Sequence, residues 1–239
     1  MLIFGHRGFC HLYPENTILS HLKAIDAGAM GIETDLRITS DDEIILMHDT
    51  TLVCFPLFDL PYHGYIDHLR TKNESQCIPL LKDLLNSLLQ PPYDRCTVVL
   101  DIKEDNPIAI LDKLQAILSI HDFTPERLIL GVWNQEFLFK AKELFANRHQ
   151  IMLIHEHWPP KSTSSLAIPE EALASDLIDI FSIDWDAVKK APSQVIDRVH
   201  QAHKLIFVWV LNSTADIEMA RTAGFNAVIT DCPNLAKKS

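Results

Sequence analysis

Two histidines, an arginine and two carboxylates stand near the start of the chain, each at or near the end of an apolar run. They are His6, Arg7, Glu33, Asp35 and His48. Together these side chains could cleave a phosphate ester. Histidines transfer protons, a guanidinium binds phosphate oxygens through its forked donors, and carboxylates hold a divalent cation that neutralises the phosphate.

The spacing of the carboxylates favours one shared metal site. Glu33 and Asp35 are two residues apart in the predicted strand 31–36, so both side chains project to the same face. Asp101 and Lys103 end a later strand. Three carboxylates from neighbouring strands form an oxygen-rich site, which suits one Mg²⁺ or Ca²⁺ ion, with Mn²⁺ as a third option, better than Zn²⁺.

The two histidines are expected on opposite sides of one phosphodiester. His48 falls on the return strand of a predicted hairpin, roughly opposite Asp35, and from there it can reach the same pocket as His6. One imidazole can accept a proton from the attacking oxygen while the other donates a proton to the leaving alkoxide. Lys103 is expected on the phosphate, although it could instead be an ion-pair partner of Asp101 or Glu104.

Apolar runs alternate with helical patterns along the whole chain. Eight runs are predicted to be strands: 2–4, 31–36, 97–102, 127–132, 151–154, 178–183, 205–210 and 227–230. Seven segments between them have helical spacing: 17–28, 80–89, 107–120, 135–147, 169–176, 193–203 and 214–223. Strands that are apolar on both faces and alternate with helices indicate a parallel sheet covered by helices. The pattern therefore predicts an α/β fold, a closed (β/α)8 barrel rather than an open doubly wound sheet.

Catalytic groups of such barrels lie at the carboxyl ends of the strands. Trp209, near the end of the seventh strand, is therefore expected to line the substrate pocket, although an aromatic residue there is as often part of the core.

One segment interrupts the alternation. The short polar turn 39–42 predicts an antiparallel hairpin, with residues 44–47 as an extra strand. An insertion follows at about 50–78, without a clear helix and rich in aromatic residues and proline. Long loops are usually functional. We expect a lid over the site, with a lipid-facing lip or a packed insertion as alternatives.

The composition is that of an ordinary globular protein. The chain has 239 residues, 47% of them hydrophobic and 22% charged, and we expect a single domain over residues 1–239. A formal charge of -11 opposes binding to nucleic acid or to an anionic membrane surface. The five cysteines show no paired spacing, so neither disulfides nor a zinc site is expected. The first strand begins at Leu2 and no apolar stretch could span a membrane, which predicts a cytoplasmic protein.

Several motifs match one known family, in one order from end to end. They are His6-Arg7-Gly8, Pro14-Glu15-Asn16-Thr17, Gly31-Ile32-Glu33-Thr34-Asp35-Leu36, His48-Asp49-Thr50-Thr51-Leu52, Leu100-Asp101-Ile102-Lys103 and the final segment 224–233. With them the chain resembles the glycerophosphodiester phosphodiesterases, which are metal-dependent (β/α)8 enzymes.

The resemblance implies roles for seven residues. These are His6 and His48 as the acid–base pair, Glu33 and Asp35 as metal ligands, Arg7 and Lys103 on the phosphate, and Glu15 as a metal ligand or a support for the ligands. We expect a glycerophosphodiester as substrate, cleaved to sn-glycerol 3-phosphate and an alcohol. The attacking oxygen could be water or the substrate's own glycerol hydroxyl, which would give a cyclic phosphate.

Two departures from the family pattern leave alternatives open. Asp101 stands where the family usually has glutamate. Aspartate at this position is instead similar to the related sphingomyelinase D-like phospholipases. Residues 53–58 replace a polar, glycine-rich run with an apolar one. A phospholipase of the C or D type, acting on intact phospholipid or lysophospholipid with transient lipid contact, is therefore one alternative. A non-catalytic phosphoester-binding barrel is another.

Overall fold

The structure is a computed structural model, and it describes residues 1–52, 55–72, 75–121, 123–145, 148–155 and 168–236. Eight parallel strands form a closed barrel, because β1 pairs with both β11 and β2. They are β1 (Leu2–Gly5), β2 (Gly31–Ile38), β6 (Thr97–Ile102), β7 (Leu128–Val132), β8 (Gln150–His155), β9 (Ile180–Asp184), β10 (Leu205–Trp209) and β11 (Ala227–Thr230). The predicted (β/α)8 fold is confirmed.

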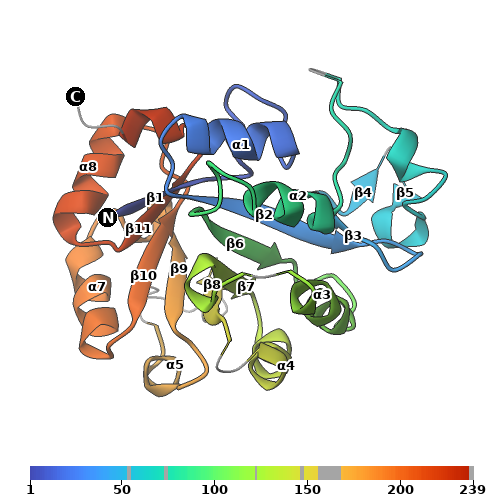
Figure 1. Cartoon of the computed structure of the whole chain (residues 1–239). Coiled ribbons are helices and arrows are strands. Elements are labelled where there is room, and N and C mark those ends of the chain that lie inside the picture. Colours follow the sequence, from blue (N-terminus) through green and yellow to red (C-terminus); the bar gives the residue numbers. More distant parts are fainter. Residues whose placement is uncertain (53–54, 73–74, 122, 146–147, 156–167, 237–239) are drawn as a thin grey trace.

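Helices cover the outside of the barrel (Figure 1). They are α1 (Ile18–Asp26), α2 (Leu81–Leu88), α3 (Ile110–Ser119), α4 (Gln135–Phe145), α5 (Glu170–Ala174), α6 (Trp185–Val188), α7 (Pro192–Gln201) and α8 (Thr214–Ala223). Six of the seven predicted helical segments contain one of these helices, and α7 begins one residue before the predicted segment 193–203. The sequence did not predict α6, a single turn that begins where the Asp184 carboxylate accepts hydrogen bonds from two backbone N–H groups. Among the described residues, no helix has the length and apolar character needed to cross a bilayer.

The predicted hairpin lies outside the ring. β3 (Ile44–Leu46) pairs antiparallel with β2, with Leu46 opposite Leu36. The insertion follows with the short strands β4 (Thr51–Leu52) and β5 (Phe55–Pro56) and two 3-10 turns, Leu57–Asp59 and Ile66–His68. It lies at the side of the barrel, beyond β3 (Figure 1).

The insertion is packed through its own apolar cluster. The buried members are Ile45, Leu57, Leu60, Tyr62, Ile66 and Leu80. The Asp41 carboxylate accepts hydrogen bonds from the backbone N–H groups of Tyr62 and His63, at 2.7 and 3.0 Å. The β2–β3 hairpin therefore holds the insertion through apolar contacts of Ile45 in β3 and polar contacts of Asp41 in the turn.

Inside the barrel, the layers that precede the carboxyl ends of the strands are apolar. They consist of Phe4, Val99, Ile129, Met152, Ile154, Ile180, Phe207, Ala227 and Ile229. Because strand side chains alternate between faces, the residue two positions further along a strand points into the same interior. That step leads from Phe4 to His6 and from Val99 to Asp101. The polar residues therefore form the last layer of the barrel interior, at the carboxyl ends of the strands.

The turn after β1 requires glycine at position 8. Gly8 has φ +88°, and a Cβ there would come within 2.7 Å of the His21 backbone nitrogen and closer still to Ser20. The same close approach lets Ser20 Oγ donate to the Arg7 carbonyl at 3.1 Å. Gly64 also has a positive φ, +80°, but a Cβ there would meet nothing within 4 Å.

These two glycines make a matched pair for a stability test. Gly64→Ala is expected to lower the free energy of unfolding by about 1–2 kcal/mol, the cost of a Cβ in the left-handed region. Gly8→Ala should lower it by about 1–3 kcal/mol more, because it also overpacks the turn against α1. Urea unfolding of both variants measures the difference, and equal losses would contradict the packing argument.

Candidate active site

The polar layer surrounds a cavity of about 160 Å³ at the carboxyl end of the barrel. Its walls are His6, Arg7, Glu33, His48, Asp101, Lys103, Trp133 and Trp209, above an apolar floor of Met152, Ile154 and Ile229. Seven of the nine predicted site residues, Trp209 among them, thus belong to the described lining. Asp35 lies immediately beside it in the acidic cluster, and Glu15 lies further out.

Three carboxylates form the acidic cluster. Ligand oxygens of Glu33, Asp35 and Asp101 all lie within 4.8 Å of one another, and all three residues are buried. Asp35 and Asp101 are register partners on β2 and β6. Burial, and then repulsion from Asp35, raises the pKa of Glu33 to about 7. Burial also raises the pKa of Asp101. Burial would raise the pKa of Asp35 as well, but the charges of Lys103 and Arg7 outweigh it and lower this pKa to about 2. The oxygen-only donors of the cluster fit a hard divalent cation.

Two cations lie against these carboxylates. Lys103 Nζ is 2.7 Å from Asp35 Oδ1 and 2.5 Å from Asp101 Oδ2. Arg7 Nε is 3.3 Å from Asp35 Oδ2, and the Arg7 backbone N–H donates to Glu33 Oε2 at 2.9 Å. Lys103 therefore forms the ion pair with Asp101 and also lines the cavity, where its ammonium group is available to a phosphate.

Asn16 fixes the orientation of Asp35. Its amide donates to Asp35 Oδ2 at 2.7 Å, and its Oδ1 accepts hydrogen bonds from Thr34 Oγ1 and the Asp35 backbone N–H. Asn16 has φ 54°, a left-handed conformation that asparagine tolerates better than most residues. The sequence pattern gave no role to this residue, although it lies beside the predicted Glu15.

Glu15 lies outside the acidic cluster. Its side chain is half exposed and accepts two hydrogen bonds from Arg7 Nη1, at 3.1 and 3.2 Å. In this arrangement Glu15 supports Arg7 and does not contact the three clustered carboxylates directly.

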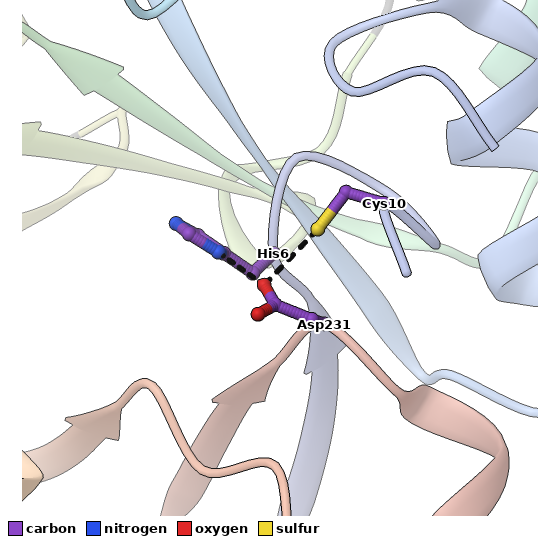
Figure 2. A group of neighbouring side chains, drawn as sticks. All are labelled: His6, Cys10 and Asp231. Carbon is purple, nitrogen blue, oxygen red and sulfur yellow. Dashed lines mark hydrogen bonds and ion pairs between the residues drawn. The ribbon is translucent and has the colours of Figure 1, made fainter. Parts of the chain in front are cut away.

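His6 is held by a residue from the other end of the chain. His6 Nδ1 lies 2.6 Å from Asp231 Oδ1 (Figure 2). The other ring nitrogen, Nε2, lies 4.0 Å from Glu33. Burial would lower the pKa of His6, but the hydrogen bond to Asp231 and the nearby Glu33 charge outweigh it and raise the pKa above 6.5. Asp231 also accepts hydrogen bonds from Cys10 Sγ at 3.0 Å and from Asn212 Nδ2 at 2.6 Å.

His48 reaches the cavity from a loop, which corrects its predicted place on the return strand. β3 ends at Leu46, and only the Met47 backbone N–H still pairs with the Asp35 carbonyl, at 3.1 Å. Arg37 then holds the His48 carbonyl with Nε and Nη2, at 3.2 and 2.7 Å. The strand is shorter than predicted because the chain leaves β2 there to enter the insertion.

The two tryptophans form an aromatic wall. Their rings pack edge to face with centroids 6.2 Å apart. Trp133 Nε1 donates to Asp101 Oδ1 at 2.6 Å, and the Lys103 ammonium lies 5.1 Å from the Trp133 ring centroid. Both Asp101 oxygens are thus bonded, one to an indole N–H and one to Lys103. Trp133 was not predicted, although it follows the end of β7, where barrel enzymes place functional residues.

Comparison with known proteins identifies the family of this chain. The family model of the glycerophosphoryl diester phosphodiesterases matches residues 6–235. The chain belongs to this family. As a member, it is an enzyme of the phosphodiesterase class, and both predictions are confirmed. Membership of an enzyme family also favours turnover over the alternative of a non-catalytic binding barrel.

Relatives in the glycerophosphoryl diester phosphodiesterase family are similar over nearly the whole chain. A glycerophosphodiester phosphodiesterase of Bacillus altitudinis is 26% identical over 252 residues, covering 99% of this chain and 96% of that protein. A human protein named lysophospholipase D is 25% identical over 273 residues, covering 96% and 82%. The structure of an Oleispira antarctica phosphodiesterase with the product sn-glycerol-3-phosphate has a TM-score of 0.81 at 19% identity, covering 98% and 94%.

The His6–Asp231 contact predicts a shift in a measurable pKa. Asp231 stabilises protonated His6, so this contribution to stability is full below pH 6.5 and is lost as the pH rises through the higher folded-state pKa. The Asp231→Asn variant lacks the negative charge beside His6, so burial becomes the largest influence on the pKa of His6. The pKa of His6 should therefore fall below 6.5, as followed by NMR titration of the imidazole resonances.

The matched control for this titration is Asn212→Ala, which removes a donor to Asp231 but keeps its charge. The pKa of His6 should stay raised in that variant. An unchanged His6 pKa in Asp231→Asn would contradict the assignment.

Proposed function

We propose that this chain hydrolyses glycerophosphodiesters to sn-glycerol 3-phosphate and an alcohol with the help of one divalent cation. One observation carries the proposal. Two histidines, His6 and His48, border a single cavity that also contains a cluster of buried carboxylates. The product complex of the Oleispira antarctica relative supports the same substrate class.

Glu33, Asp35 and Asp101 would hold the cation. When bound, a divalent ion neutralises charge on the phosphate oxygens and makes the phosphorus easier to attack. Carboxylate oxygens alone suit Mg²⁺ or Ca²⁺, with Mn²⁺ third. Asp101 is shorter than glutamate, and the hydrogen bond from Trp133 keeps its carboxylate oriented beside the cavity.

His6 and His48 would move the protons. Asp231 stabilises the imidazolium form of His6, which suits a group that accepts a proton and later returns it. His48 is 39% exposed at the side chain and borders the mouth of the cavity, where the second proton transfer can exchange with solvent. Either water or the glycerol hydroxyl can be the attacking oxygen in this scheme.

Arg7 and Lys103 would bind the phosphate. Each is already paired with Asp35, so each is held beside the cavity with donors to spare. Trp209 and Trp133 would exclude water from one side of the substrate. Glu15 would keep the Arg7 guanidinium in place.

The proposal predicts that turnover needs both histidines and a cation. His6→Ala and His48→Ala are each expected to lower kcat for glycerophosphocholine by about 10²–10⁴-fold, the usual size of a lost acid–base group. Chelation should abolish turnover, and added Mg²⁺, Ca²⁺ or Mn²⁺ should restore it. Enzymatic detection of released sn-glycerol 3-phosphate measures both effects.

His63→Ala is the matched control, because His63 is an exposed histidine of the insertion that does not line the cavity. It should retain the parental rate. A His48→Ala enzyme as active as the parent would rule out the two-histidine scheme.

A second cavity favours lysophospholipids as a second candidate substrate class. It has a volume of about 340 Å³, and His48 borders it as well as the first cavity. Its apolar lining includes Leu46, Met47, Leu52, Ile78 and Pro79. Such walls could receive a hydrocarbon chain attached near the scissile phosphate. The relative named lysophospholipase D is consistent with this candidate.

A substrate panel with Leu52→Asn separates the two classes. If the second cavity holds a hydrocarbon chain, the variant should lower kcat/KM for lysophosphatidylcholine by roughly tenfold, as expected for about 1–3 kcal/mol of lost apolar contact. It should leave glycerophosphocholine turnover unchanged. Phe58→Asn is the control, because Phe58 is 56% exposed and does not line this cavity. If the parental enzyme turned over neither lysophosphatidylcholine nor phosphatidylglycerol vesicles, the lipid candidate would be ruled out.

A further inference from the structure

Three side chains with metal-binding atoms, those of His6, Cys10 and Asp231, lie close together. His6 contributes Nδ1 to this group, whereas Nε2 is the ring nitrogen near Glu33. His6 Nδ1 and Cys10 Sγ both approach Asp231 Oδ1, at 2.6 and 3.0 Å. Figure 2 shows the imidazole and the thiol meeting this carboxylate from two different directions. We propose that His6, Cys10 and Asp231 form a second site, which binds a soft divalent cation such as Zn²⁺ and thereby inhibits the enzyme.

The geometry needs little adjustment to receive the ion. One ligand atom from each residue lies within 4.8 Å of the other two. Around Zn²⁺, with bonds of about 2.0–2.3 Å, tetrahedral ligand atoms are about 3.3–3.8 Å apart. The thiol and the imidazole would therefore move less than about 1 Å away from Asp231. Cysteine spacing did not predict this site because its ligands come from opposite ends of the chain.

The donor set distinguishes this site from the acidic cluster. One nitrogen, one sulfur and one oxygen suit Zn²⁺, whereas thiolates bind Mg²⁺ and Ca²⁺ poorly. The oxygen-only cluster has the opposite preference. The two sites should therefore take different ions, although His6 Nε2 lies only 4.0 Å from Glu33.

Support and access are both present. Asn212 Nδ2 donates to the second oxygen, Asp231 Oδ2, at 2.6 Å, so Asp231 presents one oxygen to the ion. Cys10 also lines an open groove of about 800 Å³ between residues 10–15 and Thr71–Lys72, which gives the ion a path from solvent. Three protein ligands leave the fourth position to water, as in exchangeable zinc sites.

Binding would release the protons of the thiol and of His6 Nδ1, and it would disable one imidazole. Burial, and then the contact with Asp231, raises the pKa of the Cys10 thiol, so without an ion the thiol is neutral and is no nucleophile. Zn²⁺ would replace the thiol proton and form the S–Zn bond. It would also replace the Nδ1 proton that protonated His6 donates to Asp231, so two protons would pass to solvent and the remaining imidazole proton would stay on Nε2. His6 can no longer accept a proton from the substrate side. This inhibition rests on the proposed function, but the binding does not.

Cobalt tests the binding without any assay of activity. Co²⁺ added to the metal-free protein should produce the near-ultraviolet absorption band of a cobalt–thiolate bond. The band should persist in Cys77→Ala, which removes an exposed cysteine elsewhere, and disappear in Cys10→Ala. Cys10→Ser, which retains a hydroxyl donor for Asp231, should also lack the band and guards against a folding defect. A band that persists in both Cys10 variants would overturn the site.

Inhibition is then measured at saturating Mg²⁺. Each variant is compared with its own rate without Zn²⁺. The Zn²⁺ concentration for half-inhibition should rise more than about tenfold in Cys10→Ala and Cys10→Ser. The reason is that loss of a residue that only supports a ligand already lowers the affinity of a site for its metal by about tenfold or more. Equal inhibition of the parental enzyme and these variants would overturn the inhibitory role. If no diester were turned over, the proposed function would fail while the cobalt band still reported on the site.

Discussion

The burial of three carboxylates in one layer of the barrel interior is the constraint on which the rest of the site depends. Two like charges about 4 Å apart repel by about 4 kcal/mol at the effective dielectric of a protein site. That is a large share of the 5–15 kcal/mol that stabilises a typical domain. Lys103, Arg7 and the amide of Asn16 all face these carboxylates, and the indole N–H of Trp133 donates to one of them.

The sequence was sufficient to predict what depends on strand periodicity. Every barrel strand is an apolar run, so the closed barrel followed from their number and from the helices between them. Glu33 and Asp35 were predicted on one face because they are two residues apart, and Asp101 stands in register beside Asp35. The order of the motifs identified the family, and the resemblance led to the expectation that His6 and His48 act as a pair.

What the sequence could not predict depends on contacts between distant segments. Asp231 is 225 residues from its partner His6, and nothing in the local pattern of the last strand indicates that contact. Arg37 holds the His48 carbonyl only because the chain leaves β2 at that point, which also shortened the return strand. Trp133 became relevant through a single indole N–H that donates to Asp101 on the neighbouring strand β6.

The insertion has a consequence for how such an enzyme diversifies. Its apolar cluster draws on Ile45 and Leu80, at the outer edge of the barrel, and includes none of the interior layers below the acidic cluster. Replacement of its residues can therefore leave the interior charge balance untouched. Under the proposed function, the walls of the second cavity and the groups that carry the chemistry therefore rest on separate hydrophobic cores. Changes in the insertion would then alter the choice of alcohol at little risk to the interior layers.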